Sequence, residues 1–241
     1  MRGWRAGVGA GLGVTVASLM VAVSAPQATG LELVANWQME ETSGPVMTDS
    51  SGNGLNGAIG SDVALGEATP EGNKAYRFKG DWRIVNDNRL VQIPDDDRLE
   101  PAAGTFRITL RVKTGGLDAN IAQKGQARTV GGYWKFAVNK GWPRCHFRDA
   151  NRNNLAIGFV NSANPDVYLA DGDWHTISCA RTATGVQVTI DGITKSLSKT
   201  IGPVNNKFPM TIGGKLACDP ALDVTCDYFA GAIDWVTIER P

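Results

Sequence analysis

The sequence predicts an all-β protein built from two antiparallel sheets stacked face to face. Short runs with the two-residue period of strands recur along the chain, each followed by a turn signal, and no segment sustains a helical period. The 29 glycines among 241 residues exceed the ordinary share of ~7% and suit a chain with many tight turns. Hydrophobic residues make up 42% of the chain, enough for a packed core. Many short strands without helices are typical of a two-sheet sandwich.

The clearest strand spans residues 106–112, where apolar and polar side chains alternate without a break. The apolar set is Phe106, Ile108, Leu110 and Val112, and the polar set is Arg107, Thr109, Arg111 and Lys113. This period of two predicts one buried face. The other runs lie at residues 75–78, 90–93, 121–124, 134–139, 144–147, 154–159, 174–181, 185–190, 193–197, 210–213 and 230–239. Between two of these runs, Asp191 and Gly192 predict a hairpin turn.

The strands expected at the two ends of the domain carry tryptophans. Trp37 and Met39 alternate with polar neighbours near the start, and Ile233 and Trp235 do so near the end. Such alternation requires one buried face. We therefore expect Trp37, Trp235 and also Trp174 to lie in the core.

The first thirty residues have the pattern of a secretion signal. Arg2 and Arg5 supply a positive start, residues 6–23 form an apolar run, and small residues follow between Ala25 and Gly30. The alternative is a membrane anchor, but the run is near the ~18-residue lower limit for a span and has no basic flank on its far side. We expect cleavage within the small-residue stretch, which gives a secreted protein with no membrane span.

After a signal peptide at residues 1–30, residues 31–241 are expected to fold as one domain with almost no net charge. Lys and Arg number 24, as do Asp and Glu. Removing Arg2 and Arg5 with the leader leaves 22 against 24, a net charge of about −2. Without a positive field or a basic stripe, nucleic-acid binding is disfavoured.

Four cysteines indicate disulfides and an oxidising compartment. Three pairings are possible. Cys218 and Cys226 are eight positions apart and most simply staple one loop. Cys145 and Cys179 lie in separate strand-like runs and would then form a cross-strand bridge. A zinc site is the alternative, but the chain has no Cys-x-x-Cys pair and its two histidines are not at ligand spacing.

Several runs together resemble a known family. They are YRFKG at residues 76–80, GTFRITLRVKT at 104–114, DGDWHTI at 171–177 and VTIDG at 188–192, besides the two tryptophan strands at the ends. In this order they resemble secreted actinobacterial laminin-G-like domains, which are concanavalin A-like jelly rolls. The resemblance covers nearly all of the mature chain and implies a two-sheet antiparallel jelly-roll sandwich. This fold hosts lectins, carbohydrate-binding modules, adhesion domains and some glycanases, so it does not fix the function.

A catalytic role finds little support in the sequence. The glucanases of this fold carry carboxylates as Glu-x-Asp-x-x-Glu on one strand, and no such run occurs. The acids at residues 95–97 form a contiguous turn, and we expect their side chains to diverge into solvent. Residues 133–136 superficially resemble a strand of polysaccharide lyases with this fold, but the companion Gln-x-His strand is missing. We expect His146 and His175 to be packed or surface-bonded, and we predict no catalytic residue.

A structural calcium ion is the cofactor that the resemblance implies, between the first and last strands. Calcium needs six to eight oxygen ligands. Asp49 and Asn53 in a glycine-rich turn, with Glu40 and Asp234 from those strands, are the predicted ligands. The alternative is that Asp49 and Asn53 make turn hydrogen bonds, as such residues commonly do. A second acidic cluster surrounds the 218–226 loop, with Asp219, Asp223 and Asp227.

A polysaccharide or glycoconjugate is the predicted ligand, bound without catalysis. Exposed aromatic rings stack on sugar faces when planar polar groups flank them. Trp82 with Arg83, and Trp142 with Arg144, lie in loop-like contexts and are the predicted ligand contacts. Two alternatives remain open: an adhesion domain that binds a cell-surface or envelope protein, and a divergent glycanase.

Overall fold

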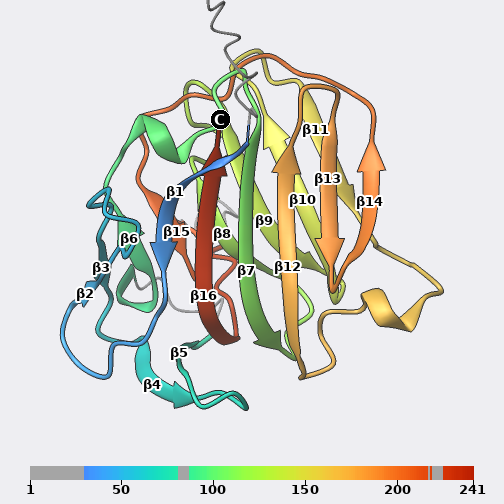
Figure 1. Cartoon of the computed structure of the whole chain (residues 1–241). Helices are drawn as coiled ribbons and strands as arrows, with labels where there is room; N and C mark the ends of the chain where they lie inside the picture. Colours follow the sequence, from blue (N-terminus) through green and yellow to red (C-terminus); the bar gives the residue numbers. More distant parts are fainter. Residues whose placement is uncertain (1–29, 81–86, 217, 219–224) are drawn as a thin grey trace, which may run out of the picture.

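The computed structural model describes residues 30–80, 87–216, 218 and 225–241 as two antiparallel sheets packed face to face (Figure 1). In sheet A the strands run in the order β14 (Ile193–Leu197), β13 (Val186–Ile190), β12 (Trp174–Arg181), β7 (Phe106–Thr114), β16 (Gly231–Arg240), β5 (Lys74–Phe78) and β4 (Ala64–Ala68), with β1 (Glu32–Trp37) also on β16. In sheet B the order is β11 (Asn154–Gly158), β10 (Trp142–Arg148), β9 (Tyr133–Asn139), β8 (Ala119–Lys124), β15 (Met210–Ile212), β6 (Val91–Ile93), β3 (Gly57–Ile59) and β2 (Val46–Met47). The all-β prediction is confirmed.

Helical structure in the described residues is limited to three single 3-10 turns: η1 (Asp87–Arg89), η2 (Asp97–Leu99) and η3 (Pro165–Val167). None of the described helices is long and apolar enough to cross a membrane. The expected signal sequence lies almost wholly in residues 1–29, outside the described residues, so it stays a prediction.

The first and last strands of the domain are neighbours. β1 pairs antiparallel with β16, with Trp37 opposite Val236 and Glu32 opposite Arg240 (Figure 1). β5 joins β16 nearer its start, where Gly231 faces Phe78. The last strand therefore holds together segments from both ends of the domain.

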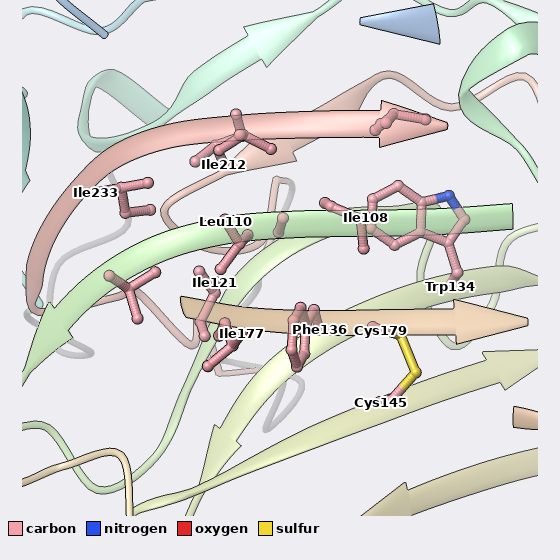
Figure 2. Close-up of a cluster of buried hydrophobic side chains, with 14 of the residues drawn as sticks. Ile108, Leu110, Ile121, Trp134, Phe136, Cys145, Ile177, Cys179, Ile212 and Ile233 are labelled. Atoms are coloured by element: carbon pink, nitrogen blue, oxygen red, sulfur yellow. A yellow bond between two sulfur atoms is a disulfide. The ribbon is translucent and has the colours of Figure 1, made fainter. Parts of the chain in front are cut away.

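The core fills the space between the sheets. Along β7 every second residue is buried, so the predicted alternation is confirmed. Ile108 and Leu110 from β7 face Trp134 and Phe136 from β9 across the sandwich (Figure 2). The Trp134 indole also donates a hydrogen bond of 2.9 Å to the Leu99 carbonyl, which satisfies its one polar atom.

Two of the three tryptophans expected in the core are not there. Trp37 is fully buried, as predicted. Trp174 and Trp235 are half-exposed on the outer face of sheet A, so the prediction for them is wrong. In β16 the pairing with β7 shifts between Ile233 and Trp235, and this bulge turns Trp235 to the face opposite Ile233.

Trp174 lies on the outer face for a different reason. It precedes the buried Ile177 by three positions, so its side chain points away from the core. Its ring there lies 5.0 Å from the Arg111 guanidinium.

Both predicted disulfides are present. Cys145 on β10 bonds to Cys179 on β12, so this bridge joins sheet B to sheet A through the core (Figure 2). Cys218 bonds to Cys226, eight residues further along the chain. Disulfides of this kind suggest an extracellular protein.

Candidate ligand-binding site

A row of polar side chains crosses the outer face of sheet B. Thr211 on β15 lies opposite Gln123 on β8, and Gln123 lies opposite Lys135 on β9. Lys135 in turn lies opposite His146 on β10. Residues directly opposite each other in antiparallel strands share a face. The row therefore runs across four strands, on the side of the sheet away from the core.

A hollow of about 250 Å³ opens beside this row and is called the sheet B groove here. Its floor comes from β8, β9 and β10, and its polar lining consists of Asp118, Asn120, Lys135, Asn139, Arg144, His146 and Asp227. The loop stapled by Cys218 and Cys226 supplies Asp227 as one wall.

Asp227 is fixed to the floor by hydrogen bonds. Its carbonyl accepts from the Asn120 amide at 2.9 Å, and its carboxylate accepts from Asn120 Nδ2 at 3.1 Å. Lys215 makes an ion pair of 2.9 Å with the same carboxylate. Beneath the loop, Cys218 and Cys226 pack with Leu90 and Tyr228 in a small apolar cluster. The disulfide therefore helps to build one side of the groove.

Two cations in the groove have no counter-ion. Within the described part of the chain, neither Lys135 nor Arg144 makes an ion pair. Burial lowers the pKa of Lys135; Asp227 opposes this effect, while Lys215 and Arg144 add to it. Neither cation is thus paired with a carboxylate of the groove.

His146 is a neutral member of the row. Burial lowers its pKa to about 4, and the charges of Lys135, Arg144 and Arg148 add to this effect. Its ring meets the Tyr133 ring edge-on at 5.1 Å between centroids, and Nε2 lies 3.3 Å from Asn154 Oδ1. His146 is therefore uncharged at neutral pH and acts as a hydrogen-bonding group.

Gln123 carries an unused donor. It is 2% exposed, and its Oε1 accepts from Asn120 Nδ2 at 2.9 Å. Its Nε2 is buried and has no hydrogen-bond partner among the described residues. An unpaired buried amide is costly, so an acceptor that reached Gln123 Nε2 would stabilise the fold.

A second hollow, of about 380 Å³, adjoins Trp142 at the start of β10. Trp142 and Tyr168 are among its lining residues, with their rings edge-to-face at 5.1 Å between centroids. Gly141 has a φ of +87°, and a Cβ there would overlap the Tyr168 ring, so only glycine permits this aromatic pair. The buried Trp142 Nε1 has no hydrogen-bond acceptor in the part that the structure describes.

The two hollows lie along one strand. Trp142, Arg144 and His146 are alternate residues of β10 and therefore point to the same side. Trp142 also lies opposite Asn139, which lines the sheet B groove. Two of the predicted ligand contacts, Trp142 and Arg144, are thus neighbours on this face. The other two, Trp82 and Arg83, lie outside the described residues.

The predicted calcium ligands do not form one set. Both carboxylate oxygens of Asp49 accept hydrogen bonds from protein donors, at the amides of Asn36, Ser51 and Leu55 among others. Asn53 donates its side-chain amide to the Val34 carbonyl at 2.9 Å. These contacts make the residues organisers of the turn beside β1, which is the alternative role that the sequence allowed.

The other two predicted ligands belong to a different cluster. Asp234 is buried and accepts from Arg111 at 2.8 Å. Burial raises its pKa, and the nearby charges of Glu40 and Glu71 add to this rise. Glu40 accepts from the Lys74 amide at 3.1 Å. Both carboxylates are therefore engaged away from the Asp49 turn.

A different acidic group has the spacing of metal ligands. Carboxylate oxygens of Asp95, Asp97 and Glu100 lie within 4.8 Å of one another, and such a group can hold a metal ion. The prediction that the side chains of residues 95–97 diverge is wrong for Asp95 and Asp97. Two lysines are the reason. The buried Lys124 ammonium bonds to Asp95 at 2.6 Å and to Glu100. The exposed Lys207 ammonium bonds to Asp97 at 2.6 Å and lies 3.7 Å from Asp95. Of the second predicted acidic cluster, Asp219 and Asp223 lie outside the described residues.

We predict that His146 makes folding stability depend on pH. The unfolded chain protonates this histidine near 6.5 and the folded chain near 4. Between these values the unfolded state holds more protons, so stability falls as the pH drops. The loss at pH 5 is about 2 kcal/mol. Urea unfolding of the wild type and of His146→Gln at pH 7 and pH 5 measures it, and the wild type should lose more.

His175 should affect the pH dependence of stability in the opposite direction. Burial lowers its pKa, but hydrogen bonds to Asp171 and Asp191 outweigh that effect and raise it overall. The stability that His175 contributes is fully present below about pH 6.5. It is lost as the pH rises through the pKa that His175 has in the folded protein. Equal pH dependence in the wild type and His146→Gln would contradict a buried neutral His146.

Of the groove residues, Arg144 was predicted from the sequence as a ligand contact and Asp227 as part of an acidic cluster, whereas Lys135 and Asn120 were missed. Lys135 lies between the buried Trp134 and Phe136, and that parity already places its side chain outside the core. The position of Asp227 in the groove carries no such signal, because it depends on hydrogen bonds to Asn120, which is 107 residues away in the chain.

Comparisons with known proteins show the fold. No protein-family model matches the chain, and no curated protein matches it by sequence. The botulinum neurotoxin serotype G binding domain matches with a TM-score of 0.61 and 16% identity, over 86% of this chain and 47% of that one. The botulinum neurotoxin serotype D ligand binding domain in complex with N-acetylneuraminic acid matches with a TM-score of 0.59 and 12% identity, over 86% and 46%. This chain therefore spans about half the length of each.

Domains LG4-5 of the mouse laminin alpha1 chain match more weakly, over 56% of this chain and 36% of that one, with a TM-score of 0.46 and 16% identity. At this TM-score the two structures are too different to support a conclusion about this chain. The jelly-roll sandwich is confirmed, while kinship with actinobacterial laminin-G-like proteins stays a prediction.

Proposed function

We propose that the protein is a secreted, non-catalytic module that binds a polysaccharide or glycoconjugate along the outer face of β10. The observation that carries this proposal is the alignment of Trp142, Arg144 and His146 on one face, with a hollow at each end. Sugar-binding surfaces combine an aromatic ring with a few placed polar groups. Here Trp142 and Tyr168 offer the rings, and Asn120 and Asn139 the planar amides.

The carboxylates of the groove support binding rather than catalysis. Asp118 accepts from Asn139 Nδ2 at 3.3 Å and from the Lys140 amide at 3.0 Å. Asp227 is held by Asn120 and Lys215. Hydrolysis of a glycosidic bond normally needs an acid of raised pKa and a second carboxylate facing it. These two acids serve instead as acceptors within the site.

The matched structures agree with a binding role in general terms. They are binding domains, and the serotype D domain holds N-acetylneuraminic acid. At 12–16% identity this likeness concerns the fold. The sugar specificity of this chain therefore rests on its own groove.

A glycan and polysaccharide array tests the proposal. Saturable binding that falls at least tenfold in Trp142→Ala would support it. Trp235→Ala is the matched control, because Trp235 is also half-exposed but lies on the outer face of sheet A. An array without signal would favour the alternative of a protein-binding adhesion module. Release of reducing sugar would favour the glycanase.

We predict that chelation leaves the domain stable. The predicted calcium ligands Glu40, Asp49, Asn53 and Asp234 make separate sets of protein contacts, so they do not fit a single ion that needs six or more oxygens. The group of Asp95, Asp97 and Glu100 is already paired with the ammonium groups of Lys124 and Lys207. The Tm measured by calorimetry should be the same in EDTA and in calcium chloride. A fall of several degrees in EDTA, restored by calcium, would instead support a structural calcium ion.

A further inference from the structure

The sheet B groove has a surplus of positive charge. Lys135 and Arg144 line it, Arg148 projects from the same face of β10, and Lys215 stands at its wall. Arg148 donates to the Ala127 carbonyl at 3.3 Å and makes no ion pair in the described part of the chain. Lys215 is the one cation of the four with an ion pair there.

The acids of the groove do not balance this charge. Asp227 is neutralised by Lys215. Asp118 keeps its negative charge, because its partners, the Asn139 side chain and the Lys140 backbone amide, are neutral. It can offset only one of the three remaining cations, Lys135, Arg144 and Arg148. Burial is the main cause of the lowered pKa values of Lys135 and His146, and neighbouring cations add to it, while Asp227 opposes the fall for Lys135. An anionic ligand would relieve the excess of positive charge.

The geometry lets two cations meet at one point. Lys135 lies opposite His146, while Ala137 lies opposite Arg144, so Lys135 and Arg144 are diagonal neighbours on adjacent strands. Long side chains reach each other at such positions. The guanidinium can grip a carboxylate or sulfate with two parallel hydrogen bonds, and the ammonium adds a point charge.

Two buried donors without acceptors among the described residues lie beside the groove. The buried Nε2 of Gln123, directly opposite Lys135, is a donor without an acceptor in the described chain. Two residues from Arg144 along β10, Trp142 offers a ring and an indole N–H that also lacks an acceptor there. The site thus presents an anion-binding end and an aromatic end.

We propose that the groove selects an acidic polysaccharide, with the anionic group of one sugar held between Lys135 and Arg144 and the next part of the chain against Trp142. This inference rests on the proposed function and deepens it by naming the ligand class. Carboxylate and sulfate share the chemistry that the groove recognises, and the polymers used in the test distinguish them.

Binding is measured by calorimetry with polygalacturonate, dextran sulfate and neutral dextran, at low and at moderate salt. At least one acidic polymer should bind, more weakly as salt screens the charges, and neutral dextran should not. The double variant Lys135→Gln/Arg144→Gln should bind the acidic polymer at least tenfold more weakly. Arg144→Lys keeps the charge but loses the planar fork, so it should show a smaller loss.

Lys199→Gln is the matched control. It removes one positive charge from an exposed position after β14, away from the groove, and should bind like the wild type. Both groove residues are half-exposed, so thermal melts of the double variant should show that it remains folded.

Each result has a distinct meaning. Binding of polygalacturonate assigns the anion as carboxylate, and binding of dextran sulfate alone assigns it as sulfate; both support the inference. Equal binding of neutral dextran would overturn acid selectivity and leave the proposed function standing. Acidic-polymer binding that the double variant retains would overturn the site. No binding to these polymers or to any glycan on the array would overturn both proposals.

Discussion

Replacing Lys124 by methionine should destabilise the domain by about 3–5 kcal/mol. The Lys124 side chain is completely buried, and its ammonium uses all three donors, on Asp95 at 2.6 Å, on Glu100, and on the Asn206 carbonyl at 2.7 Å. Glu100 is itself 1% exposed. Methionine fills a similar volume but leaves this carboxylate buried without its cation. Urea unfolding at pH 7 measures the loss.

Two companion variants isolate the cause. Lys124→Met/Glu100→Gln removes both buried charges, and should recover a large part of the stability, since the cost lies in an unpaired charge. Lys207→Met removes a lysine whose side chain is 71% exposed, although it makes a 2.6 Å ion pair with Asp97. A surface pair of this kind is worth less than about 1 kcal/mol. A loss in Lys124→Met no larger than in Lys207→Met would refute the buried-pair argument.

The same lysine shows what the sequence could not reveal. Lys124 ends a strand whose period places it on the core side, opposite Trp134. Alternation alone gives no reason to bury an ammonium. Burial becomes tolerable because η2 and the segment at Asn206 bring a carboxylate and a carbonyl from distant parts of the chain. Contacts of that range leave no trace in a local pattern.

Long strands with one buried face were predictable because their period is sustained. β12 and β14 begin and end at the predicted residues 174–181 and 193–197. The Asp191–Gly192 hairpin is also confirmed, with positive φ at both positions, as its tight turn requires. In such segments the side-chain pattern and the pairing register agree, so the local sequence is enough to predict the strand and its buried face.

Short or irregular strands escaped prediction. β2 has two residues and β3 three, too few to show a period. β4 contains Gly66 at a φ of +78°, and its pairing with β5 shifts register between Ala64 and Glu67. A bulge likewise moved Trp235 from the expected core to the surface. One inserted residue moves every later side chain of the strand to the opposite face of the sheet. Alternation therefore predicts the wrong face where the backbone has a bulge.

The candidate site was predictable only in part, since it is assembled from several segments. Trp142 and Arg144 share one strand and one face, which alternation can indicate. The groove also needs β8 and β9 beside that strand, and Asp227, next to Cys226, bonded to Asn120 of β8. Strand order and loop docking are properties of the whole fold, and they decide which polar residues meet.

Removing the disulfide between the sheets should cost about 4 kcal/mol of stability. Cys145 and Cys179 are separated by 34 residues, and the chain-entropy model gives this value for a closed loop of that length. The bridge also joins β10 of one sheet to β12 of the other inside the core, where both cysteines are fully buried. Urea unfolding of Cys145→Ala/Cys179→Ala at pH 7 measures the loss, which should appear as a lower midpoint.

Removing the second disulfide should cost less stability than removing the first but should weaken ligand binding more. Cys218 and Cys226 are separated by eight residues, so Cys218→Ala/Cys226→Ala should cost less, about 2.5 kcal/mol. Cys226, however, directly precedes Asp227, which bonds to Asn120 and lines the groove. We therefore expect weaker polysaccharide binding in this variant, and unchanged binding in folded Cys145→Ala/Cys179→Ala. If the inter-sheet variant lost binding while the loop variant kept it, the sheet B groove could not be the binding surface, because the loop that walls it would then be irrelevant to the ligand.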